Sequence, residues 1–436
     1  MRIACRARWI GGTLGFWCLA LPFMAGPLPA GEGEAAWQKV DTEEQLLKDT
    51  HQIMTPGLFD RGAVTKVAFP VDGTPVEIKL PHEGVGADGK PRPPLQGALR
   101  QRAIWLDLDG DKKPGAKEIS AIGPDGDAGP FAYAASYADG ASGIYTFKLQ
   151  ATRVAGEFLI VRLCARVARP TKKNAVVLID DDGNGLYNDV GRDAILVDTQ
   201  PVSYLGRQMY LGEQLFELVV HPSGTTIELR PMAHYQAGRV NLFKEYTYPQ
   251  KAENLRIHTV IAQGTDASFG FSPQQPTRDL PVGAYDLVFA LFERATERVY
   301  MLKGDKTSFS VDANKEVTVK WGGPIRANFT ATAAGPEISL SPPSFVGVAG
   351  ESYFPSDYRK IPFYGYLNVY QKDRRGNLSD RTENKATDKF PYDANGELKP
   401  LVFEYRRNDE LQLAIEYRSG ILGPVRGERR LSHNPR

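Results

Sequence analysis

The chain lacks an excess of charge of either sign and is poor in cysteine. Its 436 residues include 53 basic and 52 acidic side chains, so the formal net charge is only +1. Without a strong positive field, nucleic acid is not an expected partner. Two of the three cysteines, Cys5 and Cys18, lie in the N-terminal segment described below. Cys164 then stands alone, and an intrachain disulfide is excluded.

The chain also lacks the motifs of the easily recognised hydrolases. It contains neither Gly-x-Ser-x-Gly nor His-Glu-x-x-His, and its six histidines show no paired metal-binding spacing. Residues 84–90 have the spacing of a phosphate-binding loop, but Pro91 occupies the position that needs a hydroxyl group. Glycosidases stay open, because their two acids can lie far apart in sequence. No catalytic residue is assigned, and a non-enzymatic protein is favoured.

Residues 1–30 have the order of a secretory signal peptide. Three arginines precede an apolar run at residues 9–25, and small residues lead to a cleavage site after Ala30. The run is shorter than the roughly 20 residues that span a bilayer, so a membrane anchor is less favoured. It also contains Pro22. We therefore expect a secreted, periplasmic or cell-surface protein without stable membrane insertion after cleavage.

The rest of the chain favours an all-β fold. The whole sequence has 43 glycines and 31 prolines, which are more turn-forming residues than a helical protein tolerates. One helix is expected in a leader at residues 31–56, where Asp41 and Thr42 can cap it and Pro56 ends it. Short alternating apolar runs elsewhere predict hairpins. The expected strand pairs are residues 216–220 with 226–229, 285–292 with 298–302, and 399–405 with 412–417.

Breaks in the strand pattern predict three β-sandwich units, at residues 57–206, 207–325 and 335–430. In the second unit, the segment from Leu280 to Leu287 resembles the Pro-x-Gly-x-Tyr strand entry of transthyretin-like and immunoglobulin-like modules. The resemblance implies tandem sandwiches of one of these types, with the ring of Tyr285 buried at the start of a strand.

Acidic residues follow two apolar runs in the same pattern. Residues 103–106 lead into Asp107-Leu-Asp-Gly-Asp111, and residues 176–179 lead into Asp180-Asp-Asp-Gly-Asn184-Gly. Oxygens at loop positions 1, 3 and 5 let a tightly wound backbone aim three side chains at one hard cation. The candidate metal ligands are Asp107, Asp109, Asp111 and Glu118 in the first loop, and Asp180, Asp182, Asn184, Asp189 and Asp193 in the second.

Both loops resemble the Asp-x-Asp-x-Asp/Asn-Gly calcium loops of EF-hands and dockerins, which implies bound Ca²⁺ with a structural role. Gly185 supplies the sharp turn at position 6 of the second loop, where the first loop has Lys112. Apolar strands replace the helices of an EF-hand, which favours a calcium-binding turn within a β-sandwich. The alternative is that these residues are solvated hairpin tips, because Asp, Asn and Gly are good turn formers.

Residues 105–110 also resemble the nucleophile loop of haloacid dehalogenase-type phosphatases. That resemblance implies an attacking Asp107, an acid at Asp109 and a magnesium ion. Asp111 departs from the family pattern, and the helices that alternate with strands in that fold are not predicted. A metal-dependent hydrolase is therefore a minor alternative.

Tyr364, Tyr366 and Tyr370 alternate with non-aromatic residues, so their rings are expected on one face of a strand. Such a face could stack sugars or contact a partner protein, or it could simply cover its own sheet.

We expect a calcium-stabilised protein that binds or scaffolds in the cell envelope or outside the cell. A polysaccharide or an envelope protein is the expected partner, and a carbohydrate-binding or adhesion module is the alternative.

Overall fold

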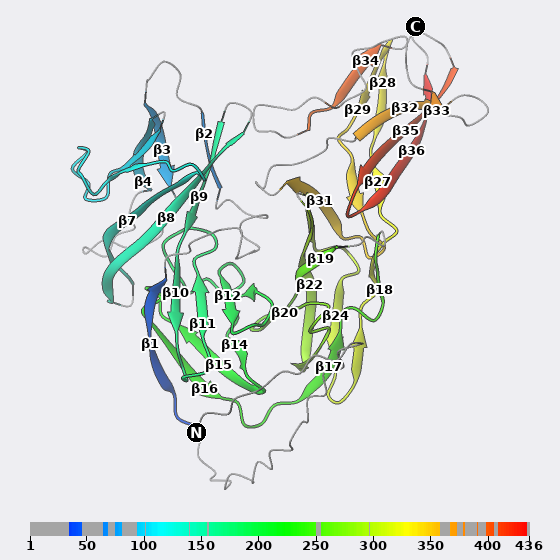
Figure 1. The fold of residues 1–436 in the computed structure, drawn as a ribbon. Helices are drawn as coiled ribbons and strands as arrows, with labels where there is room; N and C mark the ends of the chain where they lie inside the picture. Colours follow the sequence, from blue (N-terminus) through cyan, green and yellow to red (C-terminus); the bar gives the residue numbers. More distant parts are fainter. Residues whose placement is uncertain are drawn as a thin grey trace, which may run out of the picture. The chain divides into compact units, whose positions relative to one another are not determined.

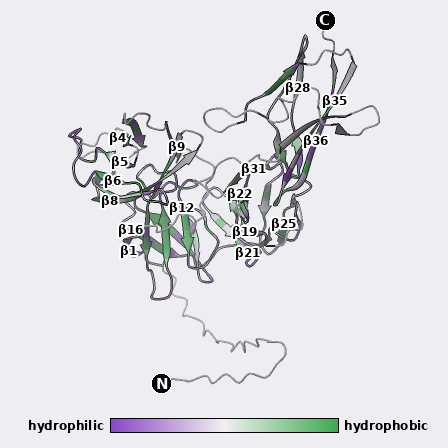
Figure 2. Cartoon of the chain, turned by 45° about the horizontal axis from the view of Figure 1, so that its top comes forward, coloured by the Kyte–Doolittle hydropathy of each residue, from purple (hydrophilic) through white to green (hydrophobic). Residues whose placement is uncertain are grey.

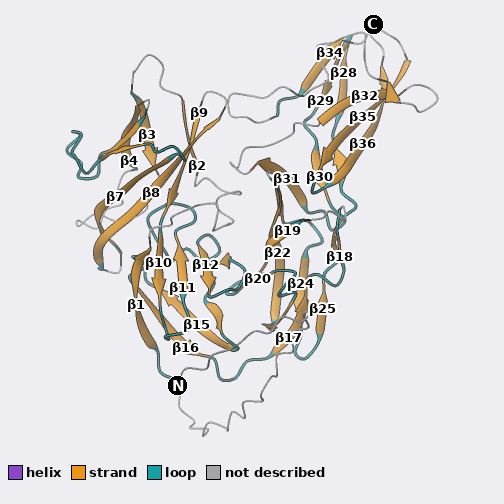
Figure 3. Ribbon diagram, in the orientation of Figure 1, coloured by secondary structure: helices purple, strands orange, loops and turns teal. Residues whose placement is uncertain are grey.

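The structure, a computed structural model, describes residues 35–45, 64–68, 75–80, 94–100, 102–138, 140–154, 157–249, 254–295, 297–357, 367–372, 378–379, 390, 398–404 and 409–433. Every regular element in these ranges is a β-strand, and the expected all-β class is confirmed (Figure 3). The expected signal peptide lies outside the described residues. No helix long and apolar enough to cross a membrane occurs in the part that is described.

The expected leader helix is not shown. Its first residues, from Asp41 onwards, belong to strand β1 (Gln38–Gln45), and residues 46–56 lie outside the described ranges. A helix does not form here because β1 pairs with a strand on each side. Gln38–Asp41 pair with one strand and Thr42–Gln45 with another. Thr42, the expected cap, instead donates its hydroxyl to the carbonyl oxygen of Gly224 at 2.5 Å. Tertiary pairing overrides a local propensity here.

β1, labelled in Figure 1, belongs to an eight-stranded antiparallel sheet and lies between β10 and β16 in the strand order. The sheet contains strands from both sides of the boundary expected at residue 206. The division into three units stays a prediction. In order across the sheet, the strands are β13 (Ser203–Tyr204), β12 (Ala194–Val197), β11 (Val176–Ile179), β10 (Ala165–Ala168), β1, β16 (Thr226–Pro231), β15 (Gln214–Val220) and β14 (Gln208–Leu211).

Two four-stranded sheets share a hydrophobic core with the eight-stranded sheet. Phe147, Leu178 and Leu229, from different strands of this core, are each at most 1% exposed. The first sheet has the order β2 (Val64–Ala68), β9 (Glu157–Leu163), β8 (Ser142–Val154) and β7 (Asp127–Ser136). The second has the order β3 (Val76–Leu80), β4 (Leu95–Arg100), β5 (Ala103–Leu106) and β6 (Ile119–Ala121).

The largest sheet has twelve strands. In order they are β20 (Ser268–Phe271), β19 (Arg256–Gln263), β22 (Gly283–Arg294), β23 (Glu297–Leu302), β31 (Ser352–Asp357), β30 (Ser344–Val346), β27 (Arg326–Asn328), β36 (Gly423–His433), β35 (Asp409–Ser419), β32 (Leu367–Lys372) and β33 (Leu378–Ser379), with β24 (Ser308–Val311) beside β22.

Three small sheets complete the described fold. They are β21 (Thr277–Pro281), β17 (Ala237–Asn241) and β25 (Glu316–Thr318); β18 (Tyr246–Thr247) and β26 (Trp321–Gly322); and β28 (Ala331–Ala334), β29 (Glu337–Leu340) and β34 (Leu401–Glu404). Figure 2 labels β21, β25 and β28 among them.

Two of the expected hairpins are confirmed and one is wrong. β15 pairs with β16, and β22 with β23. The third expected pair falls on strands β34 and β35, but β34 pairs with β29, whereas β35 pairs with β32 and β36.

A second large core packs residues from Tyr210 to Val425. Fully buried Trp321 donates its indole N–H to the carbonyl oxygen of Leu242 at 2.6 Å. The ring of Tyr285 is buried at the start of β22, as expected, and its hydroxyl donates to the carbonyl oxygen of Pro281 at 3.0 Å. One core thus contains residues of both the second and the third expected unit.

Candidate metal centre

Both acidic loops connect neighbouring antiparallel strands. The first, residues 107–118, joins β5 to β6, and the second, residues 180–193, joins β11 to β12. In each loop one acid directly follows the outgoing strand and another directly precedes the returning strand. Because antiparallel pairing brings these two ends together, the sheet itself places the first and last acids near each other. The strand flanks expected for both loops are confirmed.

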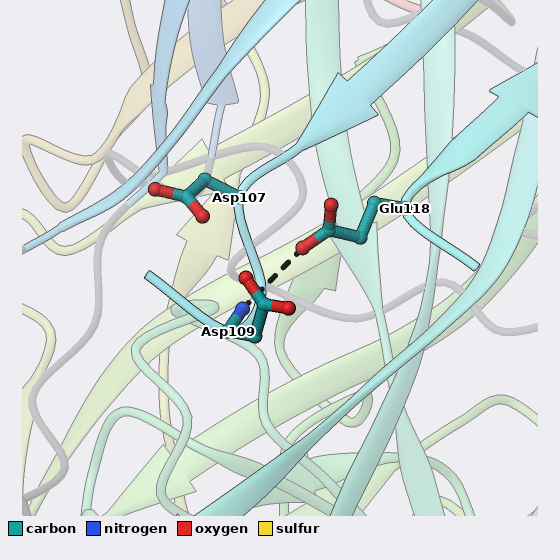
Figure 4. A group of neighbouring side chains, drawn as sticks. All are labelled: Asp107, Asp109 and Glu118. Atoms are coloured by element: carbon teal, nitrogen blue, oxygen red, sulfur yellow. Dashed lines mark hydrogen bonds between the residues drawn. The ribbon is translucent and has the colours of Figure 1, made fainter. Parts of the chain in front are cut away.

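Asp107, Asp109 and Glu118 gather in the first loop. One carboxylate oxygen of each lies within 4.8 Å of the oxygens of the other two. Figure 4 shows the Glu118 carboxylate accepting a 3.3 Å hydrogen bond from the backbone nitrogen of Asp109. Glu118 is 5% exposed and also accepts from the backbone nitrogen of Leu108 at 2.7 Å and from Nε1 of Trp105 at 3.4 Å. Glu118 therefore holds the loop in place, while Asp109 is exposed to solvent.

Asp180, Asp182 and Asp193 gather in the second loop within the same 4.8 Å limit. This group is enclosed, because Asp180 and Asp193 are each 1% exposed and Asp182 is partly buried. Backbone amides orient the two buried carboxylates. Asp180 accepts from the backbone nitrogen of Gly185, and Asp193 from that of Asp189, each at 2.8 Å.

The two loops share one pattern of hydrogen bonds. In both, the side chain at position 3 accepts from the backbone nitrogen two residues later, and the side chain at position 5 does the same. These bonds wind the backbone tightly around the acidic side chains. The acceptor and donor pairs are Asp109 with Asp111 and Asp111 with Lys113 in the first loop, and Asp182 with Asn184 and Asn184 with Leu186 in the second.

Position 6 makes the same turn in both loops. Gly185 has a φ of 96°, and Lys112, at the equivalent position, has a φ of 59°. In each case the first acid accepts from this residue's backbone nitrogen, Asp107 from Lys112 at 3.2 Å and Asp180 from Gly185. The first loop therefore makes the turn with a lysine in place of glycine. A lysine is sterically strained in this left-handed backbone conformation.

The second loop concentrates like charges in a poorly solvated place. Burial raises the pKa of Asp180, and the nearby Arg162 guanidinium partly offsets this. Burial and the Asp180 carboxylate raise the pKa of Asp182 to about 7. The same two causes raise the pKa of Asp193 well above its ordinary value. Three adjacent carboxyl groups cannot all ionise at low cost unless a cation lies among them.

Sequence reasoning missed the polar residues behind this group. The hydroxyl of Tyr145 donates to the Asp180 carboxylate, and Sγ of Cys164 lies 3.5 Å from the same oxygen. Burial raises the pKa of the Cys164 thiol well above its ordinary value. Arg162 was the available signal, because it is the one cation in the otherwise apolar run at residues 158–164.

The remaining predicted ligands lie around the two groups of three. Asp111 is exposed and stays outside the first group, bonded to its own loop. Asn184, which is 2% exposed, donates its amide to Asp189 at 2.5 Å. Within the second group, Asp182 lies 3.7 Å from the Arg192 guanidinium. The carboxylate triads are thus smaller than the predicted ligand sets.

The expected tyrosine face is not described. Tyr364 and Tyr366 lie outside the described residues, and Tyr370 lies in β32, where its side chain is not described. Its role as a ligand face stays a prediction.

The strand pairing does not support the phosphatase resemblance. β5 precedes Asp107 and pairs antiparallel with both β4 and β6. The phosphatase fold instead requires a parallel sheet with alternating helices.

Comparison with known proteins assigns no family. No protein-family model matches the chain, and a search of curated proteins finds no significant relative.

Proposed function

We propose that the chain is an exported, calcium-stabilised protein of tandem β-sandwich units, with a binding or scaffolding role in the cell envelope or outside the cell. The observation that carries the proposal is the repeated loop geometry. Two hairpins in different sheets each bring three carboxylates within 4.8 Å, on the same backbone winding. Solvated hairpin tips have no need to bury their acids, yet Asp180 and Asp193 are enclosed.

Calcium fits these donor sets better than zinc. Three carboxylates offer up to six oxygen ligands, and Ca²⁺ takes six to eight oxygens in flexible geometry. Zinc favours Cys and His, which neither triad contains. The resemblance to EF-hand and dockerin loops supports the same ion, and extracellular modules of this kind bind it with Kd values of roughly 10⁻⁴ to 10⁻³ M.

Sandwich architecture and export support each other in this proposal. The described sheets pack around two large cores, and the segment from Leu280 to Leu287 resembles a strand entry of transthyretin-like and immunoglobulin-like modules. The signal-like residues 1–30 favour export. Outside the cell, millimolar calcium would keep weak sites occupied and stabilise the fold by mass action.

Trp105 offers a direct test of the first loop. Its indole nitrogen lies 3.4 Å from the Glu118 carboxylate, so a terbium ion bound in place of calcium would receive energy from this ring. Excitation selective for tryptophan should then give terbium emission that calcium displaces. Trp105→Phe should remove the emission, and Asp180→Asn, in the other loop, should leave it unchanged.

The second loop is tested by isothermal titration with calcium. Asp193→Asn should remove one class of binding sites while the terbium signal at Trp105 persists. Absence of both sensitised terbium emission and calcium-binding heat from the folded protein would disprove the proposal.

A further inference from the structure

We propose that Arg278 forms the centre of a binding site for a carboxylate ligand, separate from the acidic loops. Arg278 lies on β21, the outer strand of a three-stranded sheet, opposite Val240 of β17. Its guanidinium reaches toward the edge strand β14, where its central carbon lies 5.8 Å from the centre of the Tyr210 ring.

The partners of this guanidinium are all neutral. One terminal nitrogen donates to Oε1 of Gln200 at 2.9 Å, and the other donates to Oε1 of Gln275 at 3.5 Å. Asp279, the nearest acid in sequence, instead binds Arg239 at 2.9 Å. In the part of the chain that the structure describes, no carboxylate pairs with Arg278.

Two other enclosed arginines do have acidic partners. Arg298 has a side chain that is 6% exposed and lies 2.8 Å from Glu293. Arg166 is 10% exposed and lies 3.7 Å from Glu44. A largely enclosed charge is costly without a partner, and burial accordingly lowers the pKa of the Arg278 guanidinium. The unpaired Arg278 therefore favours an anion from outside the chain.

The unused donors point to where this anion would bind. A guanidinium has five N–H donors, and the two bonds to glutamine side chains use two of them. Within the described residues, Nε of Arg278 makes no hydrogen bond, and it is open to solvent. Nε2 of Gln275 likewise makes no hydrogen bond to a described residue and is open to solvent.

This arrangement fits a planar carboxylate. The Tyr210 ring lies near the guanidinium, and the free N–H donors remain along the edge of the guanidinium. A carboxylate can accept two parallel N–H bonds in that plane, the geometry in which arginine binds carboxylates best. Two sources share this chemistry: a uronic acid of an acidic polysaccharide and the C-terminal carboxylate of a peptide.

The test uses the full-length folded protein, freed of calcium on a chelating resin and kept in a buffer without carboxylates, so that calcium bound to the loops cannot take part. Glucuronate, an N-acetylated dipeptide with a free carboxylate, and inorganic phosphate are titrated separately, and the melting temperature and heat of binding are recorded. We expect saturable stabilisation by glucuronate or by the dipeptide, and the stronger of the two identifies the source. Stabilisation by phosphate alone would overturn the proposal.

Variants assign the effect to one side chain. Arg278→Met should weaken carboxylate binding about tenfold or more, since two charge-assisted hydrogen bonds are lost. Arg239→Met, which removes an exposed arginine of the adjacent strand, should bind as the parent does. Arg278→Lys keeps the charge but loses the planar fork, and should bind several-fold more weakly.

Ligand-free stability separates binding from a purely structural role. If Arg278 serves a ligand, Arg278→Met should melt at or above the parent's temperature without ligand, because an unpaired enclosed charge is removed. A large loss of stability in Arg278→Met, together with unchanged carboxylate binding in Arg278→Lys, would show a structural clamp and refute the site. The same conclusion follows if no carboxylate stabilises the parent protein.

Discussion

The acidic group of the second loop makes a specific prediction about pH and calcium. Burial and the Asp180 charge raise the pKa of Asp182 from 3.8 to about 7 in the folded protein. The unfolded chain releases this proton near pH 4, whereas the calcium-free fold retains it up to about pH 7. Raising the pH through this window therefore destabilises the calcium-free fold, because the unfolded state binds fewer protons.

The magnitude follows from the shift. A change from 3.8 to about 7 is about three pKa units, which at about 1.4 kcal/mol per unit gives an upper limit of about 4 kcal/mol. Asp182 is partly open to solvent and lies 3.7 Å from Arg192. The shift already includes the attraction of Arg192, and solvent screens the charge further, so we expect about 2 kcal/mol. A domain of about 150 to 250 residues would lose roughly 4 to 8 °C in Tm.

Calcium should reverse this trend. Bound Ca²⁺ stabilises the ionised carboxylates, and a concentration about 100 times the Kd adds about 2.7 kcal/mol. Calorimetry at pH 5.0, 6.0 and 7.5, in excess calcium or in EDTA, should show that the difference in Tm between the two buffers grows with pH. Asp182→Asn cannot titrate at this position and should show a smaller pH dependence in EDTA. If the calcium-free Tm rises between pH 5.0 and 7.5, or the two buffers give equal Tm values at pH 7.5, the reasoning is wrong.

Three further predictions concern single residues. Lys112→Gly removes the side chain from a residue whose backbone has a φ of 59°. This should raise the free energy of unfolding, measured in urea, by about 0.5 to 1 kcal/mol. A loss of stability would contradict the strain assigned to this turn. Glu351 is fully buried and accepts hydrogen bonds from the backbone N–H groups of Gly322 and Ala349. Glu351→Ala leaves these buried donors without a partner and should lower the free energy of unfolding by about 3 kcal/mol or more. A loss under about 1 kcal/mol would be inconsistent with that role. Cys164 is 1% exposed, and burial raises the pKa of its thiol, so it should not react with a disulfide reagent until the protein unfolds; rapid labelling of the native protein would contradict the buried position.

The sequence predicted local features well and distant pairing poorly. Alternating apolar residues and turn signals were sufficient for the β15–β16 and β22–β23 hairpins, because these strands are neighbours in the chain. Both strands of the third expected hairpin exist, but β34 pairs with β29. Pairing between distant strands depends on the packing of whole sheets, which a local pattern does not contain.

The candidate site divides in the same way. Spacing of acids after apolar strands identified Asp107, Asp109 and Glu118, and the structure brings these three together. The residues behind the second group, Tyr145 and Arg162, come from strands β8 and β9. Arg162 stands out as a cation in an apolar run, but nothing in the local sequence shows that it or Tyr145 lies beside Asp180. The sequence therefore predicted the carboxylates, whereas their surroundings depend on tertiary packing.

Strand β1 has a consequence for how the chain reaches this fold. Its first half pairs with β16 and its second half with β10, so it joins strands from residues 165–168 and 226–231. During synthesis β1 leaves the ribosome before either partner, and more than a hundred further residues must follow before its backbone groups can exchange water for these strands. Until β1 is inserted, β10 and β16 each present an open edge that can pair with another chain. Aggregation in this protein should therefore begin from molecules in which this early strand has not yet found its place.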